Sequence, residues 1–305
     1  MNQYALGASQ VLVAGVLWGT SGTIASFFPH SVSPLVIGAL RLAVGGLCLT
    51  IILGVTTKGV WFAPTTKIYP KHVLLVAFSI ALTQVMIFLG VQLAGVTIAT
   101  MVFIGSAPLF SGIFSWIRYK RNQKPIWWIS SSIVIIGCLL MAISDNSEVR
   151  GALIMKGSAS ALLAGAGWAM AGVVIKEMQK SASSLETTVI ALSSGAILLL
   201  PFAFIQGFSC LGEPSVIELT LVLGVIATAF PYLLFNMGMM GVPVPHAYLY
   251  GLIEPLVASM LGMLLLKERL SLVGIVGYLL VSGGLLLFTL WELSLNQSSA
   301  QKNLR

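Results

Sequence analysis

The sequence predicts an all-α integral membrane protein with ten membrane-spanning helices, arranged as two inverted five-helix repeats. Three observations support this prediction: the composition, the length of the apolar runs and a similarity between the two halves of the chain. Of the 305 residues, 57% are hydrophobic and only 8% are charged, and the mean hydropathy is +0.99. Because a soluble domain carries about 25% charged residues, this chain has too few charges to cover a soluble fold.

Ten apolar runs are each long enough to cross a bilayer as a helix, which takes about 20 residues. Helices are expected because lipid offers no hydrogen-bond partner to the backbone, and because the strands of a barrel would alternate apolar and polar residues. The first run is too long for a signal peptide and lacks a basic leader, so it is expected to be a true span. The predicted spans are 5–28, 33–56, 72–94, 96–117, 125–144, 151–175, 186–207, 215–237, 243–266 and 270–291.

Basic residues gather on one side of the predicted membrane. Eleven lie on the side of the amino terminus and four on the other side. Since cytoplasmic loops are rich in lysine and arginine, both termini are expected in the cytoplasm and the protein in the plasma (inner) membrane. The net charge of +7 is therefore attributed to topology and not to nucleic-acid binding. The first side has Lys58, Lys67, Lys71, Arg118, Lys120, Arg121, Lys124, Lys176, Lys180, Lys302 and Arg305, and the second has Arg150, Lys156, Lys267 and Arg269.

The second half of the chain resembles the first. A shift of 150 positions places AGVLWGTSG over AGAGWAMAG, so that Trp18 meets Trp168, and a shift of 147 positions places Pro108 over Pro255. Five spans are an odd number, so the second repeat would enter the membrane inverted, which is the architecture behind alternating access. The repeats are expected at 1–147 and 148–292, followed by a polar, disordered cytoplasmic tail at 293–305.

Several motifs together resemble the EamA-type family of the drug/metabolite transporter superfamily. They are WGTSGT at 18–23, Arg41 in the second span, SAPLF at 106–110 and IEPLVASMLGMLLLKERLSLVGIVGYLLVSGG at 253–284. The resemblance covers about residues 5 to 290, but the first half has KRN at 120–122 where the second has KER at 267–269. It implies ten helices, inverted repeats and the export or uptake of small metabolites, among which amino acids are frequent substrates.

Glu254 is the main candidate for a substrate-binding residue. An acid this deep in a span is costly and usually faces a cavity or a partner, so Glu254 could bind a substrate ammonium group or take up a proton. The structural alternative is that it pairs with Arg41 or with backbone groups freed by Pro255. Arg41 could itself hold a substrate carboxylate or reach the membrane surface. Tyr250 precedes Glu254 by four residues and is expected on the same helix face, as its partner in the cavity.

Trp18 and Trp168 are expected on opposite walls of one central cavity, because inverted symmetry would relate the two positions. Both lie too deep for the aromatic belt at the membrane surface. Each could stack on a substrate ring or on an ammonium group. The alternative is helix packing, because small residues that let helices approach closely surround both tryptophans.

The remaining candidates are polar side chains inside predicted spans. Gln84 and Asn236 could line a pathway, as could Gln92, or they could join helices through hydrogen bonds. His246 lies near the start of the ninth span and could titrate near neutral pH, which makes it, with Glu254, a candidate for proton coupling. The alternative is that His246 is an interfacial residue without a role in transport.

We expect a secondary transporter of small metabolites that exports amino acids or related compounds by alternating access. A multidrug exporter of lipophilic cations is the close alternative, because one deep acid and two deep tryptophans would also suit such a substrate. A membrane-embedded enzyme or a scaffold is the alternative from a different class. No phosphate-binding loop, nucleophile elbow or metal-ligand spacing occurs in the sequence, so no enzyme activity, cofactor or metal is expected. The expected partners are a small-molecule substrate, membrane lipid and, if transport is coupled, protons, with the protein acting as a monomer.

Overall fold

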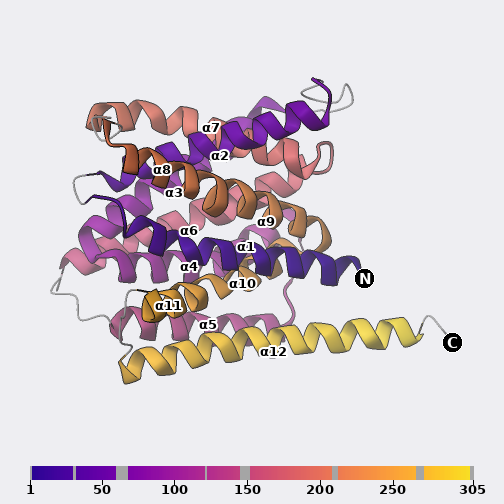
Figure 1. Ribbon diagram of the computed structural model, residues 1–305. Helices are drawn as coiled ribbons and strands as arrows, with labels where there is room; N and C mark the ends of the chain where they lie inside the picture. Colours follow the sequence, from indigo (N-terminus) through magenta and orange to yellow (C-terminus); the bar gives the residue numbers. More distant parts are fainter. Residues whose placement is uncertain are drawn as a thin grey trace.

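The computed structural model describes residues 2–29, 32–59, 68–120, 122–144, 152–207, 212–265 and 271–302. In this part of the chain all regular structure is helical (Figure 1). The predicted boundary between the repeats at 147/148, the KER motif at 267–269 and residues 303–305 lie outside the described residues.

Long helices follow one another with short connections along the described chain. They are α1 (Gln3–Ala25), α2 (Pro34–Thr56), α3 (Pro70–Ala94), α4 (Val96–Tyr119), α5 (Pro125–Ser144), α6 (Ala152–Met178), α7 (Ser184–Gln206), α8 (Pro214–Gly224), α9 (Phe230–Gly241), α10 (Val244–Gly251), α11 (Ile253–Leu265) and α12 (Leu272–Lys302). A π-helical turn, η2 (Val225–Ala229), joins α8 to α9 in one span, and α10 and α11 form another.

Nine helical segments in the described residues are long and apolar enough to cross a membrane. α1, which corresponds to the first predicted span, has 23 residues but is not one of the nine. Its two glutamines and its run of glycine, serine and threonine at 19–23 lower its hydropathy. The fold is therefore that of a multi-pass membrane protein, and the tenth span remains a prediction.

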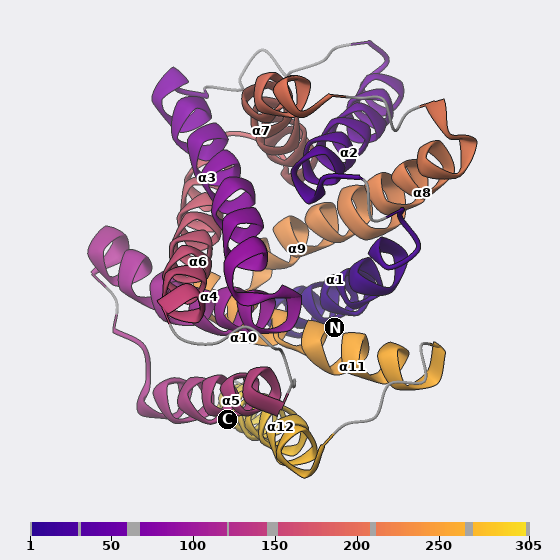
Figure 2. The same ribbon diagram turned by 90° about the vertical axis from the view of Figure 1, so that its left-hand side faces the viewer.

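Seen along the helices, the bundle has two groups of helices that flank its centre (Figure 2). In one group α6 packs closely against α3 and α4, and in the other α1 packs against α9 and α11. α2 pairs with α7, and α5 pairs with α12. Each group therefore combines helices from both halves of the chain.

The start of α1 and the end of α12 lie at the same end of the bundle (Figure 1). We call it the amino-terminal end and the opposite one the distal end. Because consecutive helices run in opposite directions, the last turns of α4, α6 and α12 also belong to the amino-terminal end. Lysines and arginines at these helix ends, such as Arg118 and Lys180, therefore gather near the amino terminus.

Pro255 explains the interruption between α10 and α11. Proline has no amide hydrogen, and its ring clashes with the carbonyl group four residues earlier, which here belongs to Gly251. Accordingly α10 ends at Gly251, Leu252 is in a turn and α11 begins at Ile253. This interruption matters for the site because side chains of α10 and side chains of α11 no longer follow the face pattern of one continuous helix.

A second proline, Pro231, follows the π-helical turn η2. The hydroxyl of Thr228 donates a hydrogen bond to the carbonyl of Leu223 at 2.9 Å within this segment. This bond gives the Leu223 carbonyl a partner inside the π-helical segment, where lipid offers none.

α12 continues beyond the predicted last span, which ends at 291, and is helical to Lys302. The structure therefore differs from the prediction of a disordered tail at 293–305 in the part that it describes. A helix satisfies its own backbone hydrogen bonds, so a polar composition alone does not end it.

α5 and α12 approach each other closely through two glycines. A Cβ atom added to Gly277 would lie 2.6 Å from the backbone oxygen of Gly137, and one added to Gly137 would lie 2.7 Å from that of Gly277. Gly283, in the same helix as Gly277, faces open space. Small residues permit such contact between membrane helices, whose association depends on van der Waals packing.

We expect Gly277→Ala to destabilise the protein by about 1–3 kcal/mol, because the added methyl group forces two backbones apart. Gly283→Ala adds the same methyl group in open space, and alanine favours helices, so this control should melt at the wild-type temperature or slightly above it. Thermal unfolding of the purified variants in detergent measures both effects. Equal melting temperatures for the two variants would contradict the close approach of α5 and α12.

Candidate functional site

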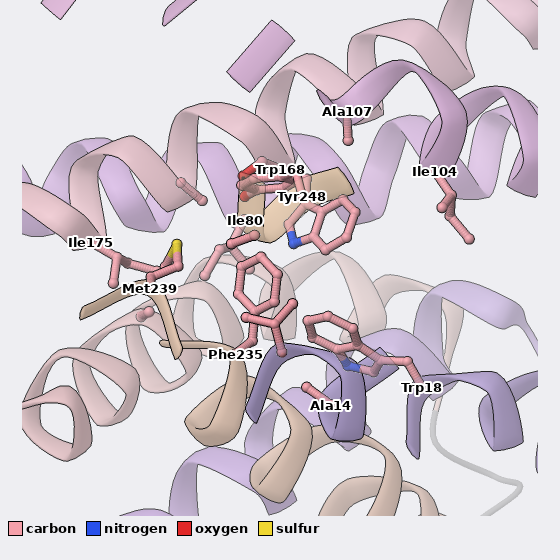
Figure 3. Close-up of a cluster of buried hydrophobic side chains, with 14 of the residues drawn as sticks. Ala14, Trp18, Ile80, Ile104, Ala107, Trp168, Ile175, Phe235, Met239 and Tyr248 are labelled. Atoms are coloured by element: carbon pink, nitrogen blue, oxygen red, sulfur yellow. The ribbon is translucent and has the colours of Figure 1, made fainter. Parts of the chain in front are cut away.

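Aromatic side chains meet at the centre of the bundle, where the two helix groups face each other (Figure 3). Trp18 of α1 lies against Trp168 of α6, with ring centroids 5.6 Å apart and planes at 78°. Phe235 of α9 contacts both, at 5.2 Å from Trp18 and 6.0 Å from Trp168. We call the following residues the aromatic cluster: Trp18, Phe103, Trp168, Tyr232, Phe235 and Tyr248.

The structure brings Trp18 and Trp168 into contact and does not hold them apart across a cavity. Only 6% of Trp18 and 7% of Trp168 is exposed. Tyr248 of α10 packs edge-on against Trp168 at 4.7 Å, and its hydroxyl donates to the Trp168 carbonyl. Aromatic pairs of this geometry contribute about 0.5–1.5 kcal/mol each beyond their buried area. In this conformation the aromatic cluster therefore closes the centre of the bundle.

A polar group lies beside the aromatic cluster. Tyr232 contacts Trp18, with ring centroids 5.2 Å apart. The Arg41 guanidinium of α2 and the Glu254 carboxylate of α11 interact electrostatically with Tyr232 and with each other. Within the part of the chain that the structure describes, no direct ion pair joins Arg41 to Glu254. The two opposite charges therefore attract each other without being in contact.

Tyr250 does not lie with Glu254, contrary to the sequence prediction. Its hydroxyl is 3.4 Å from that of Tyr4, and its ring is 5.4 Å from that of Phe288. The rule that residues four apart share a face holds within one helix, and the turn at Leu252 separates α10 from α11. Tyr250 therefore belongs with residues near the amino-terminal end.

Asn236 joins helices at a position that is only 1% exposed. Its Nδ2 donates to Thr188 Oγ1 of α7 at 2.8 Å, and its backbone carbonyl accepts a hydrogen bond from Gln179 Nε2 at 2.7 Å. These contacts favour a packing role for Asn236. Gln84 is also buried and faces α2, since its Oε1 lies 3.1 Å from the place that a Cβ would take at Gly38.

A cavity of about 910 Å³ lies at the amino-terminal end of the bundle. His246 lines it, as do Tyr4, whose hydroxyl is 2.9 Å from His246 Nδ1, and residues of the α9–α10 connection. On α9 and α10 the cavity is lined by 240–246, whereas the aromatic cluster uses Tyr232, Phe235 and Tyr248. The cavity is thus on the amino-terminal side of the aromatic cluster. Its charged lining residues are Lys124, Lys176, Lys180 and Glu292.

An all-helical membrane bundle with opposite charges in its interior and a cavity at one end has the features of a transport protein. Residues 5–143 and 155–290 match the EamA-like transporter family. The chain belongs to this family, and the resemblance noted in the sequence is confirmed.

Individual relatives agree with this assignment. "Uncharacterized transporter YwfM" of Bacillus subtilis (strain 168) is 34% identical over 284 residues, which cover 92% of each chain. "Threonine/homoserine exporter RhtA" of Escherichia coli (strain K12) is 28% identical over 268 residues, covering 86% of this chain and 83% of that protein. A solved crystal structure has the same fold, with a TM-score of 0.79 and 17% identity over 93% of this chain and 97% of the other.

We expect Asn236→Ala to destabilise the protein by about 1 kcal/mol, the scale of hydrogen bonds between membrane helices. Transport per folded molecule should stay near the wild-type level, because Asn236 bonds to neighbouring helices. Gln92→Ala, which removes an exposed amide of α3, serves as the control and should change neither property. Melting temperature and flux are measured on the same preparations. A loss of flux in Asn236→Ala at an unchanged melting temperature would show instead that Asn236 takes part in transport.

Proposed function

We propose that this protein is a secondary transporter that exports amino acids or related compounds by alternating access. The observation that carries the proposal is the placement of Arg41 and Glu254 beside the aromatic cluster, with attraction but no direct contact between them in the described structure. An amino acid carries one ammonium and one carboxylate group. Glu254 can bind the ammonium group, and the forked donors of Arg41 match a carboxylate.

The energetics of burial support the same assignment. Charged side chains inside a membrane are costly unless they pair or face a polar pathway. In the free protein the positive charge of Arg41 reduces this cost for Glu254. A bound zwitterion gives each residue an opposite charge, so that binding leaves neither charge buried alone. Trp18 and Tyr232 then supply an apolar wall for the substrate side chain.

The packing of the bundle supports two inverted repeats, at 1–147 and 148–292. Gly15 and Gly165 are related by a shift of 150, and Ser106 and Ile253 by a shift of 147. A Cβ on Gly15 would meet the side chain of Ile253, and a Cβ on Gly165 would meet that of Ser106. The same contact therefore occurs twice, once in each helix group.

Alternating access follows from this arrangement. In this conformation the cavity lies at the amino-terminal end and the aromatic cluster is closed. Rocking of the two helix groups would separate Trp18 from Trp168 and connect Arg41 and Glu254 to one end of the bundle at a time. We place the protein in the plasma membrane as a monomer with ten spans and both termini in the cytoplasm, so that the amino-terminal cavity faces the cytoplasm.

Export of lipophilic cations is the second candidate. The aromatic cluster and Glu254 favour it, because cations bind to aromatic faces and to carboxylates. Arg41 disfavours it, because a fixed positive charge next to Glu254 repels a cation and attracts a carboxylate. The exporter of threonine and homoserine among the relatives also favours an amino acid.

We expect Glu254→Gln to lower amino-acid flux from proteoliposomes at least roughly tenfold, which corresponds to about 1.4 kcal/mol. Labelled threonine, homoserine and tetraphenylphosphonium are compared, with and without a pH gradient. Glu218→Gln, at an exposed acid of α8, is the control and should transport like wild type.

Wild-type flux in a well-folded Glu254→Gln variant would contradict the proposed role of Glu254 in substrate binding. Flux of tetraphenylphosphonium without amino-acid flux would show that the protein is a multidrug exporter. A response of amino-acid flux to the pH gradient in the wild type, lost in Glu254→Gln, would assign proton coupling to Glu254. The same comparison with His246→Gln tests the other candidate.

The proposed topology predicts which end of the bundle faces the medium. In a background with Cys48, Cys138 and Cys210 replaced by alanine, we introduce Lys58→Cys near the amino-terminal end and Lys156→Cys near the distal end. Both positions are exposed. A membrane-impermeant maleimide should label the second variant in intact cells and the first only after permeabilisation. The reverse pattern would invert the orientation.

A further inference from the structure

Glu292 is a buried carboxylate in the wall of the amino-terminal cavity. Only 7% of the residue is exposed, and its Oε1 has no hydrogen-bond partner among the described residues. An unpaired buried acceptor costs about 1–3 kcal/mol, and more when it is charged. The site therefore favours a ligand that donates hydrogen bonds and carries positive charge.

Two further polar atoms in the same cavity wall lack partners within the described residues. They are Gln179 Oε1, which follows α6, and Ser115 Oγ of α4. With Glu292 of α12 they supply acceptors from three different parts of the chain. An ammonium group carries three donors and no acceptor, so it is the ligand group that best satisfies such a set.

The Glu292 carboxylate interacts with the hydroxyl of Tyr4 at the start of α1. That hydroxyl is in turn 2.9 Å from His246 Nδ1 and 3.4 Å from the hydroxyl of Tyr250. The two sequence candidates that lie near this end, His246 and Tyr250, thus support Glu292 through Tyr4.

The three lysines of the cavity have other partners. Lys180 Nζ is 2.9 Å from the Glu177 carboxylate, and Lys176 donates to the Met239 carbonyl. Lys124 Nζ lies 4.7 Å from the centre of the Trp291 ring and attracts Glu292 at longer range. In the described structure none forms a direct ion pair with Glu292.

The net charge of the cavity lining distinguishes a simple ammonium cation from a zwitterion as the ligand. Lys180 is paired with Glu177, but Lys124 and Lys176 still outnumber Glu292, the one carboxylate among the lining residues of the described structure, so the cavity has an excess of positive charge. A simple cation would be repelled by the lysines, whereas a zwitterion can turn its carboxylate toward them. The cavity therefore suits a ligand that carries both charges.

We infer that the amino-terminal cavity is a second substrate site, in which Glu292 binds the ammonium group of an amino acid before the substrate reaches Arg41 and Glu254. This inference rests on the proposed function. It makes Glu292 a recognition residue at the cytoplasmic side and Tyr4 a positioning residue.

Transport and binding measurements on Glu292→Gln test the inference. For flux started from the amino-terminal side, this variant should raise the KM for threonine about tenfold and leave the maximal rate within about twofold, whereas Glu254→Gln lowers the maximal rate. Tyr4→Phe, a milder change, should raise the KM less and also tests the site if Glu292→Gln folds poorly. Glu213→Gln, at an exposed acid of the distal end, is the matched control and should keep the wild-type KM.

Calorimetry in detergent measures which charged groups of the ligand are needed for binding. In the Glu254→Gln background, threonine should still bind, and adding Glu292→Gln should weaken binding at least tenfold. Threonine amide, a cation, and N-acetylthreonine, an anion, should both bind more weakly than threonine. Tighter binding of the amide than of threonine would overturn the zwitterion assignment.

The two proposals fail in different ways. An unchanged KM in Glu292→Gln and Tyr4→Phe, with threonine transport intact in the wild type, would overturn the second site and leave the proposed function standing. Absence of both threonine binding and threonine flux in the wild type would overturn the proposed function and this inference together.

Discussion

The interior of this protein depends on the close approach of α1 and α6 to their neighbours through small residues. In lipid there is no hydrophobic drive to bring helices together, so contact between surfaces without bulky side chains provides the attraction. Gly15 and Gly165 allow these two helices to pack directly against α11 and α4. Trp18 of α1 and Trp168 of α6 meet at the centre of the bundle, and the contact of Trp18 with Tyr232 places the cluster beside Arg41 and Glu254.

Two carboxylates, Glu254 and Glu292, have similar electrostatic surroundings. At the centre, Glu254 is balanced by Arg41, and at the amino-terminal end Glu292 is balanced at longer range by Lys124. In neither case do the described residues form a direct ion pair, which would compete with a ligand for the same charges. In the proposed mechanism a zwitterion would meet similar surroundings beside the aromatic cluster and in the amino-terminal cavity, so neither site would need to hold it too tightly for onward movement.

The features that arise from composition and local pattern could be predicted from the sequence: the helical membrane fold, most of the approximate spans, the family and the burial of Trp18 and Trp168. Features that depend on tertiary geometry could not. The link between Tyr250 and Glu254 failed because Pro255 ends a helix that the pattern shows as continuous. Glu292 was not predicted as a site residue because an acid near the end of an apolar run usually lies at the membrane surface. Its burial depends on tertiary packing, in which α10 contacts both α1 and α12 through His246.

The π-helical turn Val225–Ala229 makes the two halves of the chain unequal. In the first half, α3 comes before the proline-containing helix α4. In the second half, α8–η2–α9 comes before α10–α11 in the same way, but α3 is an uninterrupted α-helix. Under the proposed alternating access, halves that differ in this way would give the inward-facing and outward-facing states different free energies, so that one state would be more populated at rest. In the proposed mechanism the half-saturation concentrations on the two faces of the membrane then differ. Detailed balance requires the maximal rates in the two directions to differ in the same ratio. Such kinetic asymmetry lets a carrier without an energy source respond to substrate mainly from one side.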